Sequence, residues 1–405
     1  MAARSELSVA ILSATRTPIG RLGGALRTLS APTLGAHAGR AAVERSGIPA
    51  SEIEEVLFGN GIQAGVGQNP ARQVSRAVGV PDSAGAATVN MVCGSGLKAI
   101  NLGFALIRAG EFDRVLVGGM ESMSNAPHLL PGGLRWGSKP GPHTMDDAMQ
   151  RDGLMDAYGE HEIMGLTGER VARHFHLTRA EVDAFALRSN QRAVRAIQDG
   201  SFAAEVVPVP ESMTPGGKGL AHDECPRPDT SLEALAKLKT AFGANGVLTA
   251  GNSSQISDGA AALVLTSRRE VERRGLKPLA WIHSTGESGV HPDDVMEAPI
   301  PTVRKHLERV GLAPSAFDRV EHNEAFSSAS IAVQRTFGFT EEQFNVHGGA
   351  VALGHPIGAS GARIVVTLVQ ELVRSNTRLG LATACMGGGN GLSLIVDRTG
   401  LSPRA

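Results

Sequence analysis

Apolar positions along the chain follow two alternating periods. Val9–Leu12 form a short apolar run, which is typical of a buried strand. Over residues 97–107, apolar side chains recur at spacings of three and four, so they share one face of a helix. The apolar run at 115–117 then predicts another strand. Strands and helices that alternate in this way are typical of an α/β fold.

The same order of patterns occurs twice in the chain. Residues 44–56 lie over 308–320 at an offset of 264 residues (308 − 44), and both segments combine a helix end at Gly, a Pro-containing turn and a strand. A second pair of segments, Ser95–Ile100 and Ser360–Ile364, matches at nearly the same offset. We infer that the chain contains two similar halves.

The predicted fold class is α/β, with two duplicated mixed-sheet halves that share helices between and around two sheets. Residues 1–119 and 249–275 form the first half, and residues 276–405 form the second. Residues 120–248 have no counterpart in the repeat and are predicted to form an inserted, lid-like loop domain. Within it, Thr178–Glu181 has the pattern of a capping box that starts a helix. Because ligands of α/β sheets bind beyond the strand ends, we expect this insertion to cover a binding site.

The charge balance excludes one class of partner. The 405 residues include 39 Lys and Arg against 40 Asp and Glu, which gives a net charge of −1. Nucleic-acid binding needs a concentrated basic surface, so we expect no nucleic-acid partner. The basic run at 268–274 alternates with acidic residues and is expected to be a solvated helix.

Several features predict a cytoplasmic protein that does not bind membranes. No segment approaches the ~18 consecutive apolar residues of a membrane span. Residues 1–12 lack the apolar core of a signal peptide, and Ser402–Ala405 does not end in a peroxisomal tripeptide. The three cysteines cannot all pair, which favours a reducing compartment.

Cys93 is the first candidate for chemistry. It follows a predicted strand and precedes the helix over 97–107. The partial positive charge and free N–H groups of a helix N-terminus favour a thiolate, so we expect a lowered pKa for Cys93. The small neighbours Gly94 and Gly96 would let a substrate approach the sulfur. The alternative is a buried cysteine that fills a strand–helix turn.

His355 stands at the matching turn of the second half, a few residues before the helix that contains Ser360. A single histidine is more often structural than catalytic. The internal symmetry, however, places His355 opposite Cys93, and a Cys–His pair is a known way to activate a nucleophile. We therefore expect His355 to be a general base.

The other two cysteines differ in their surroundings. Cys385 ends an apolar run before the glycines 387–389, whose N–H groups are suited to an anion. These glycines lack the strand–turn–helix order of a dinucleotide-binding motif. Cys225 lies in a polar, proline-rich turn and is expected to be inert. His347 and His355 have no supporting cluster of ligands, so we expect no metal site.

As a set, these segments resemble the thiolase family. The matching motifs are, in the family's order, 16–20 (RTPIG), 89–96 (VNMVCGSG), 118–123 (GGMESM), 323–326 (NEAF), 354–358 (GHPIG) and 385–387 (CMG). The resemblance runs from about residue 7 to residue 397. The motifs are specific as a set, whereas any one of them alone would be weak.

The resemblance implies a role for each motif in acyl transfer. Cys93 would carry the acyl group as a thioester, and His355 would activate it. Cys385 would be the acid/base that exchanges the α-proton of acetyl-CoA. Asn323 would hold a water that, with His355, donates to the thioester oxygen. The N–H groups of Cys93 and Gly387 would form a second oxyanion hole, where losing one donor typically costs roughly 10²–10³ in rate.

The resemblance also implies that coenzyme A is a substrate and product, with acetyl-CoA and 3-ketoacyl-CoA as the other reactants and no separate cofactor. The implied CoA-binding residues are Leu154, Met164, Arg227, Phe242, Ser254 and Phe326. Arg227 would meet the nucleotide end. Core packing is the alternative for the two phenylalanines, and a loop cap is the alternative for Ser254. Thiolases generally form homodimers or homotetramers, and we expect the same here.

Some positions differ from the short-chain biosynthetic members of the family. Ile163 stands where those enzymes usually carry His, and Ser253–Gln255 replaces Ala-Ser-Gly, as in degradative members. His322 before Asn323 is also less usual. The loop at 141–165, in contrast, has the length of the acetoacetyl-CoA type. The acyl-chain length and the direction of the reaction therefore stay open.

Two other functions compete with thiolase activity. A ketoacyl-synthase-like condensing enzyme shares the fold but lacks a second catalytic cysteine, so Cys385 argues against it. A non-catalytic CoA-binding scaffold would not need Cys93, Asn323, His355 and Cys385 all intact. We therefore expect an acyl-CoA:acetyl-CoA C-acyltransferase that works by reversible Claisen condensation and thiolysis.

Overall fold

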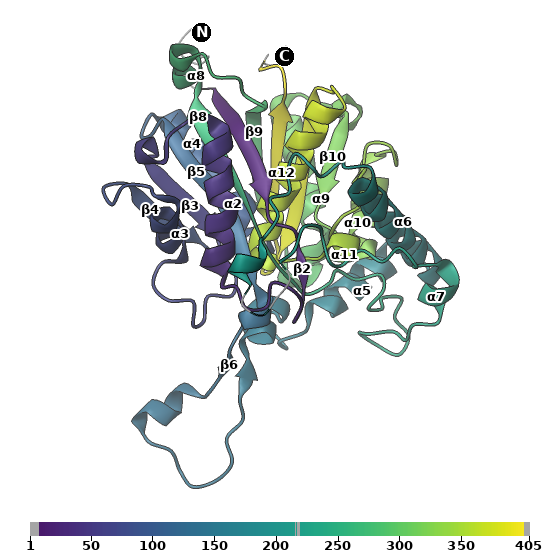
Figure 1. Cartoon of the computed structure of the whole chain (residues 1–405). Coiled ribbons are helices and arrows are strands. Elements are labelled where there is room, and N and C mark those ends of the chain that lie inside the picture. Colours follow the sequence, from purple (N-terminus) through teal and green to yellow (C-terminus); the bar gives the residue numbers. More distant parts are fainter. Residues whose placement is uncertain (1–7, 215, 217–218, 401–405) are drawn as a thin grey trace.

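The computed structural model describes residues 8–214, 216 and 219–400 (Figure 1). Its strands are β1 (Val9–Arg16), β2 (Gly20–Arg21), β3 (Glu55–Gly59), β4 (Gly85–Val89), β5 (Arg114–Ser122), β6 (His128–Leu129), β7 (Asp146–Asp147), β8 (Ser257–Ser267), β9 (Ala280–Gly289), β10 (Arg319–His322), β11 (Leu379–Met386) and β12 (Asn390–Asp397). Its α-helices are α2 (Ala31–Ser46), α3 (Pro70–Val78), α4 (Ser95–Ala109), α5 (Met164–His174), α6 (Arg179–Gln198), α7 (Leu232–Ala236), α8 (Arg268–Arg274), α9 (Pro299–Val310), α10 (Ser327–Phe337), α11 (Ala350–Leu353) and α12 (Ile357–Arg374).

The strand order confirms the predicted duplication. In the first half the order is β1-β8-β5-β3-β4, and in the second half it is β9-β12-β11-β10. Corresponding pairs have the same direction. β1–β8 and β8–β5 are antiparallel, as are β9–β12 and β12–β11 in the second half. β5–β3 is parallel, as is β11–β10. The parallel pairing of Val56 with β4 also recurs, because Val320 forms a parallel bridge to Phe344.

The sequence predicts two separate sheets, but the two halves join edge to edge into one. Val9–Ile11 of β1 pair antiparallel with Ala280–Ile282 of β9, which makes one sheet of ten strands, including β2 beside β8. An antiparallel junction of equivalent strands is what a twofold relation between the halves requires.

Alternate side chains of the strands enter different helical layers. In β1, Val9 and Ile11 join a core that contains α4 and α12, whereas Ala10 and Leu12 join a core that contains α2 and α3. A third core packs β10 and β11 against α9 and α10. Because the first core holds strand residues of both halves, α4 and α12 are the predicted shared helices (Figure 1).

The two shared helices cross where each carries a Ser-Gly pair. A Cβ on Gly96 would lie 2.8 Å from the backbone N of Ala362. A Cβ on Gly361 would lie 2.6 Å from the backbone N of Leu97. Since real Cβ atoms essentially never come this close to backbone, glycine at both positions allows the N-terminal turns of α4 and α12 to meet.

Residues between β5 and β8 have no counterpart in the second half. Their helices α5 and α6 pack on the outer core of that half through Val171, Val182 and Phe185. α6 begins with the predicted capping box, in which Thr178 and Glu181 each bond the other's backbone. The inserted segment is therefore anchored on the second half.

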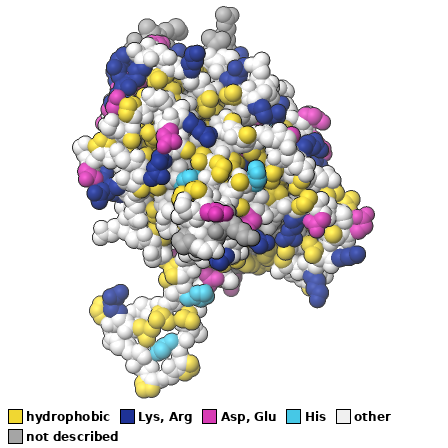
Figure 2. Space-filling model, in the orientation of Figure 1, with side chains coloured by type: hydrophobic (Ala, Val, Ile, Leu, Met, Phe, Trp, Pro, Cys, Tyr) yellow, Lys and Arg dark blue, Asp and Glu magenta, His cyan; other side chains and the backbone are white. Residues whose placement is uncertain are grey.

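Residues 130–145 of the insertion form an arm that projects from the body of the molecule (Figure 1). Leu130, Trp136 and Met145 of this arm are exposed, and Figure 2 shows hydrophobic side chains on it. Elsewhere on the face in Figure 2, basic and acidic side chains are interspersed. Within the described ranges, none of the helices has both the length and the apolar character needed to cross a membrane.

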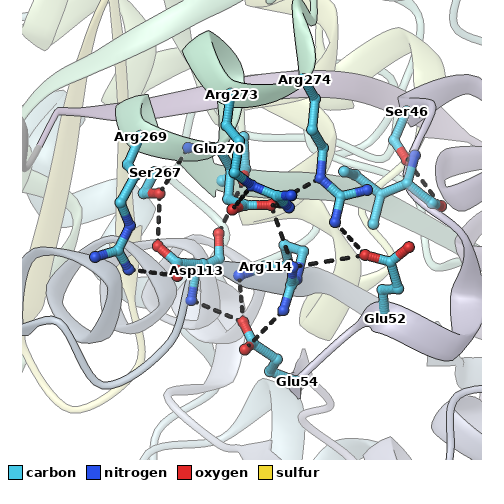
Figure 3. Close-up of polar contacts among 12 residues, drawn as sticks. Ser46, Glu52, Glu54, Asp113, Arg114, Ser267, Arg269, Glu270, Arg273 and Arg274 are labelled. Carbon is cyan, nitrogen blue, oxygen red and sulfur yellow. Dashed lines mark hydrogen bonds and ion pairs between the residues drawn. The ribbon is translucent and has the colours of Figure 1, made fainter.

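The basic run at 268–274 forms α8, as predicted, but it is not simply solvated. Glu270 is buried and pairs with Arg273 (2.7 Å), Arg274 (2.8 Å) and Arg114 (3.2 Å) (Figure 3). These ion pairs, with the hydrogen bond from Arg273 first, hold the pKa of Glu270 at about 2. The run therefore ties α8 to the start of β5.

Candidate active site

A strained turn between β4 and α4 presents Cys93. Val92 has a φ of 49°, which for a β-branched residue costs roughly 1–3 kcal/mol. The Val92 N–H donates to Asn90 Oδ1 (3.0 Å). Ser95 Oγ accepts from the Met91 N–H (2.9 Å) and donates to the Val92 carbonyl (2.7 Å). These bonds hold the turn, and Cys93 within it is half-buried.

The Cys93 thiol stays protonated at neutral pH. Burial raises its pKa to about 12, although the N–H groups of Gly387 and Cys93 act in the opposite direction, and the charge of Glu121 raises it further. The predicted lowering of this pKa is therefore wrong, because loss of hydration outweighs the helix N-terminus. Cys93 needs a base to become a nucleophile.

His355 has the protonation state and the free nitrogen that a base needs. Burial lowers its pKa to about 4, and Arg363 adds to this effect, so the imidazole is neutral. Its Nδ1 lies 2.6 Å from Ser360 Oγ, whose hydroxyl donates to the Pro356 carbonyl at 2.9 Å. Because the hydroxyl hydrogen is engaged there, the hydrogen-bond network assigns the proton to Nδ1 and the lone pair to Nε2.

Asn323 lies beside the same imidazole. Its Nδ2 is 3.5 Å from His355 Nε2. Asn323 is fully buried, and its Oδ1 has no hydrogen-bond partner among the described residues. A buried polar atom without a partner costs about 1–3 kcal/mol. The unpaired oxygen next to His355 is suited to a water or a substrate group.

Cys385 is the last residue but one of β11 and is 1% exposed. Its thiol donates to Met296 Sδ at 3.7 Å. Burial raises its pKa to about 12, and the charge of Cys93 raises it further, so the two sulfur atoms lie close enough to influence each other. Both thiols therefore hold their protons before substrate binds.

The predicted catalytic residues lie on segments that contact one another. The turn that carries Cys93 contacts both β11 and α12, and a Cβ on Gly94 would lie 2.3 Å from Met386 Sδ. The backbone of Gly387 hydrogen-bonds the Cys93 thiol, and the charge of Cys93 acts on Cys385. Asn323 contacts His355, which lies two residues before α12.

A cavity of about 600 Å³ opens beside this turn. Val92 and Gly387 line one part of it, and Met155, Tyr158 and Met164 of the insertion line another. Its volume lies in the usual range for small-molecule sites. The insertion thus forms a wall of the space next to the turn that carries Cys93.

Four of the six predicted CoA-binding residues line the cavity or belong to packed apolar clusters. Met164 lines the cavity, and Leu154 packs against the same apolar cluster as Cys93. Phe242 meets Phe326 edge to face, with ring centroids 5.8 Å apart. Phe326 is buried, so core packing describes at least this phenylalanine.

Ser254 and Arg227 have different surroundings. The Ser254 N–H donates to the Ala325 carbonyl at 3.0 Å, next to Phe326. Arg227 is exposed, and its backbone N–H donates to Asn190 Oδ1 at 3.0 Å. The described residues supply no hydrogen bond or ion pair to its guanidinium, which leaves the charge available for a ligand.

Three residues that organise the site were not predicted from the sequence. Glu121 is fully buried and accepts hydrogen bonds from both halves, although it lies in the motif at 118–123. The sequence identifies Ser360 only as the repeat counterpart of Ser95, whereas in the structure its hydroxyl hydrogen-bonds Nδ1 of His355 and orients the imidazole. Met296 had no signal in the sequence. No cluster of three or more potential metal ligands is found in the described ranges.

Known proteins place the chain in a family. Residues 9–269 match the family model for the thiolase N-terminal domain, and residues 276–398 match that for the thiolase C-terminal domain. The chain belongs to the thiolase family. The predicted fold class and the predicted enzyme class are thereby confirmed.

Relatives of this thiolase include enzymes with two kinds of name. It is 44% identical over 391 residues to an acetyl-CoA acetyltransferase of Pseudomonas aeruginosa, covering 96% of this chain and 99% of that one. A thiolase from Ascaris suum, solved in complex with coenzyme A, is 42% identical with a TM-score of 0.91, covering 96% and 100%. Human mitochondrial 3-ketoacyl-CoA thiolase is 36% identical with a TM-score of 0.93, covering 97% and 100%.

Proposed function

We propose that Cys93 is the nucleophile of a two-step acyl transfer. In thiolysis, His355 Nε2 takes the Cys93 proton while the sulfur attacks the 3-keto carbon of a 3-ketoacyl-CoA. The bond between C2 and C3 then breaks. The acyl group stays on the Cys93 sulfur, and the electron pair leaves with acetyl-CoA as an enolate.

Cys385 completes the first step by giving its proton to the enolate, which leaves as acetyl-CoA. Coenzyme A then attacks the thioester on Cys93, its thiol proton passes to the Cys385 thiolate, and His355 returns a proton to Cys93. All groups regain their starting states. Condensation is the same sequence reversed.

The observation that supports this proposal is the set of resting protonation states: two protonated thiols and one neutral imidazole. The raised pKa of Cys385 keeps a proton available for the enolate. The lowered pKa of His355 keeps Nε2 unprotonated for Cys93. The resting protonation states therefore agree with the first chemical step of thiolysis.

Two groups of donors would stabilise the oxyanions. The Gly387 N–H, which already acts on the Cys93 sulfur, supports a role for it and the Cys93 N–H toward the oxygen of the acyl group. The unpaired Oδ1 of Asn323 supports a water bound there that, with His355, donates to the acetyl-CoA oxygen. No other cofactor enters this scheme.

We propose that the insertion at 120–248 is a lid that binds coenzyme A. Leu154 and Met164 would contact the pantetheine arm, with Phe242, Ser254 and Phe326 behind it. Arg227 would bind the nucleotide phosphates, since its guanidinium is exposed and free of protein acceptors in the described structure. Arg227→Ala should raise KM for CoA substrates more than it lowers kcat, because this binding is lost equally from ground and transition states. An unchanged KM in steady-state assays would remove Arg227 from the site.

We also propose a homodimer, or a homotetramer built from dimers, in the cytoplasm. β4 supports the dimer because it forms an outer edge of the sheet with exposed and partly exposed residues, beside which a strand of a second copy can pair. The three free cysteines support a reducing compartment. Sedimentation of the purified protein would test the assembly.

One assay tests the central proposal. Acetoacetyl-CoA and CoA should be consumed, with a fall in thioester absorbance, and brief incubation with acetyl-CoA should acetylate Cys93. Peptide mass spectrometry that finds the acetyl group mainly on Cys225 or Cys385 would overturn the assignment. A panel of longer and branched 3-ketoacyl-CoAs would define the acyl chain.

A further inference from the structure

Glu121 is a buried carboxylate that contacts both halves of the molecule. It lies in β5, is fully buried, and accepts from Asn60 Nδ2 at 2.6 Å through Oε1. Its Oε2 accepts from the Gly61 N–H at 2.9 Å and from the Gly358 N–H at 2.8 Å. The Ile62 N–H lies 3.3 Å from both oxygens. One side chain thus joins the loop after β3 to the first turn of α12.

The approach of these segments depends on small residues. A Cβ on Gly358 would lie 2.5 Å from the Met120 carbonyl oxygen and 2.8 Å from Asn60 Cα. A Cβ on Gly61 would lie 2.8 Å from Glu121 Oε2. α12 begins two residues after His355, so the position of its first turn determines where the imidazole stands.

No cation pairs with the charge of Glu121 in the part of the chain that the structure describes. The donors are backbone N–H groups and one amide, and burial raises the pKa of the carboxyl to about 7. Burying a carboxylate with neutral partners alone costs stability. The charge of Glu121 also raises the pKa of the Cys93 thiol.

We propose that Glu121 is a positioning residue for acyl transfer, because its carboxylate locks the α12 turn that follows His355 to the loop beside the nucleophile turn. The inference rests on the proposed roles of Cys93 and His355. The same carboxylate opposes early ionisation of Cys93, so the thiolate forms when His355 takes the proton.

Two substitutions separate the charge from the position. Glu121→Gln removes the charge and places an NH₂ group against backbone N–H donors. It should slow acetylation of Cys93 by acetyl-CoA about 10²-fold, as for a misplaced catalytic group. It should also lower the pH midpoint for alkylation of Cys93 by iodoacetamide by about one pH unit, the size expected for removal of a nearby charge. Glu121→Asp keeps the charge but not the reach, so acetylation should slow while the alkylation midpoint stays near that of the wild type.

Glu169→Gln is the matched control. Glu169 is also buried and accepts two backbone N–H groups, from Val247 (2.9 Å) and Leu248 (2.8 Å), so its loss should leave the alkylation midpoint of Cys93 unchanged. A folded Glu121→Gln enzyme with wild-type acetylation and an unmoved midpoint would overturn the proposal, as would full acetylation by Glu121→Asp. If the wild type is never acetylated on Cys93, the proposed function fails instead, and the alkylation midpoints still report on Glu121.

Discussion

Equivalent serines hold the turns that carry Cys93 and His355, the two residues proposed for acyl transfer in the first and second halves. Ser95 and Ser360 occupy matching positions of the repeat, and each hydroxyl donates to a carbonyl of the preceding turn. Ser95 also accepts from the backbone of the turn that carries Cys93, whereas Ser360 accepts from the imidazole of His355. A serine at the same position of the repeat therefore fixes the backbone of the Cys93 turn in the first half and the tautomer of His355 in the second half.

Ser360→Ala should impair the base without removing it. The imidazole loses the acceptor for Nδ1–H, so its orientation and tautomer are no longer fixed. We expect acetylation of Cys93 to slow roughly 10–100-fold, the usual effect of removing a group that orients a functional histidine. Rapid-quench mass spectrometry would measure the rate.

Ser393→Ala is the control for this experiment. Ser393 makes the same kind of bond, 2.7 Å from His306 Nδ1, in a buried position that is not part of the site. Acetylation as slow in Ser393→Ala as in Ser360→Ala would show that the effect comes from general loosening of the core.

The two cysteines should separate by step. Cys385→Ser keeps the size of the side chain but replaces a thiol by a hydroxyl, a poorer acid and base for this proton. The variant should still form acetyl-enzyme on Cys93 and should lose thiolysis and condensation by ~10² or more. Cys93→Ser should lose acetylation itself. Near-normal condensation by Cys385→Ser, measured with acetyl-CoA, would mean that another group exchanges the α-proton.

At the scale of elements, the crossing of α4 and α12 is the contact on which the site depends. α4 starts beside the turn that carries Cys93, α12 starts two residues after His355, and the glycines at 96 and 361 set the separation of the two helices. In a helix, Ala at such a position would gain up to about 1 kcal/mol in propensity. Contacts near 2.6 Å with backbone outweigh that gain, because neither helix can retreat from the packed core.

Gly361→Ala should therefore destabilise the protein by about 1–3 kcal/mol, the usual cost of overpacking. Urea unfolding followed by circular dichroism would measure the change. In Gly39→Ala of α2, the new Cβ would meet a flexible methyl of Val78 at 3.2 Å, so the effect should be much smaller. Equal effects in the two variants would show that the crossing tolerates a methyl group.

The sequence predicts the ends of helices more accurately than it predicts the pKa values of buried side chains. The helix ends at Gly47 and Gly311 and the capping box at Thr178 follow from local chemistry, and each is present as expected. The pKa of Cys93 was predicted in the wrong direction, because the sequence shows the helix N-terminus but not the burial that opposes it. The role of Glu121 cannot be predicted from the sequence, because its hydrogen-bond partners lie 60 and 237 residues away and only the fold brings them together.

At the scale of the whole molecule, buried histidines make stability depend on pH. His306 is 2% exposed and hydrogen-bonds Ser393 and Ser284, and burial lowers its pKa to about 3. Below about pH 6.5 the unfolded chain protonates this histidine while the folded chain does not. Its contribution to stability is therefore lost as the pH falls from 6.5 toward 3.

His306→Gln should remove this part of the pH dependence. Between pH 6 and 4, the unfolding free energy of the wild type should fall relative to that of the variant by up to about 1.4 kcal/mol per pH unit. Groups with raised pKa, such as Glu321, act in the opposite direction but are common to both proteins and cancel in the difference. His222 is exposed, so a plot of urea midpoint against pH for His222→Gln should run parallel to that of the wild type. A parallel plot for His306→Gln would contradict the assignment to His306.

The place of β1 in the sheet has a consequence for synthesis of the chain. β1 leaves the ribosome before β8 and β9, which begin at residues 257 and 280, yet all eight of its residues are buried between these two strands. At roughly 5–20 residues per second, β1 waits about 13–50 seconds for its first partner. During that time an apolar strand has no sheet to join, so the nascent chain should depend on chaperones that bind extended segments until β8 emerges.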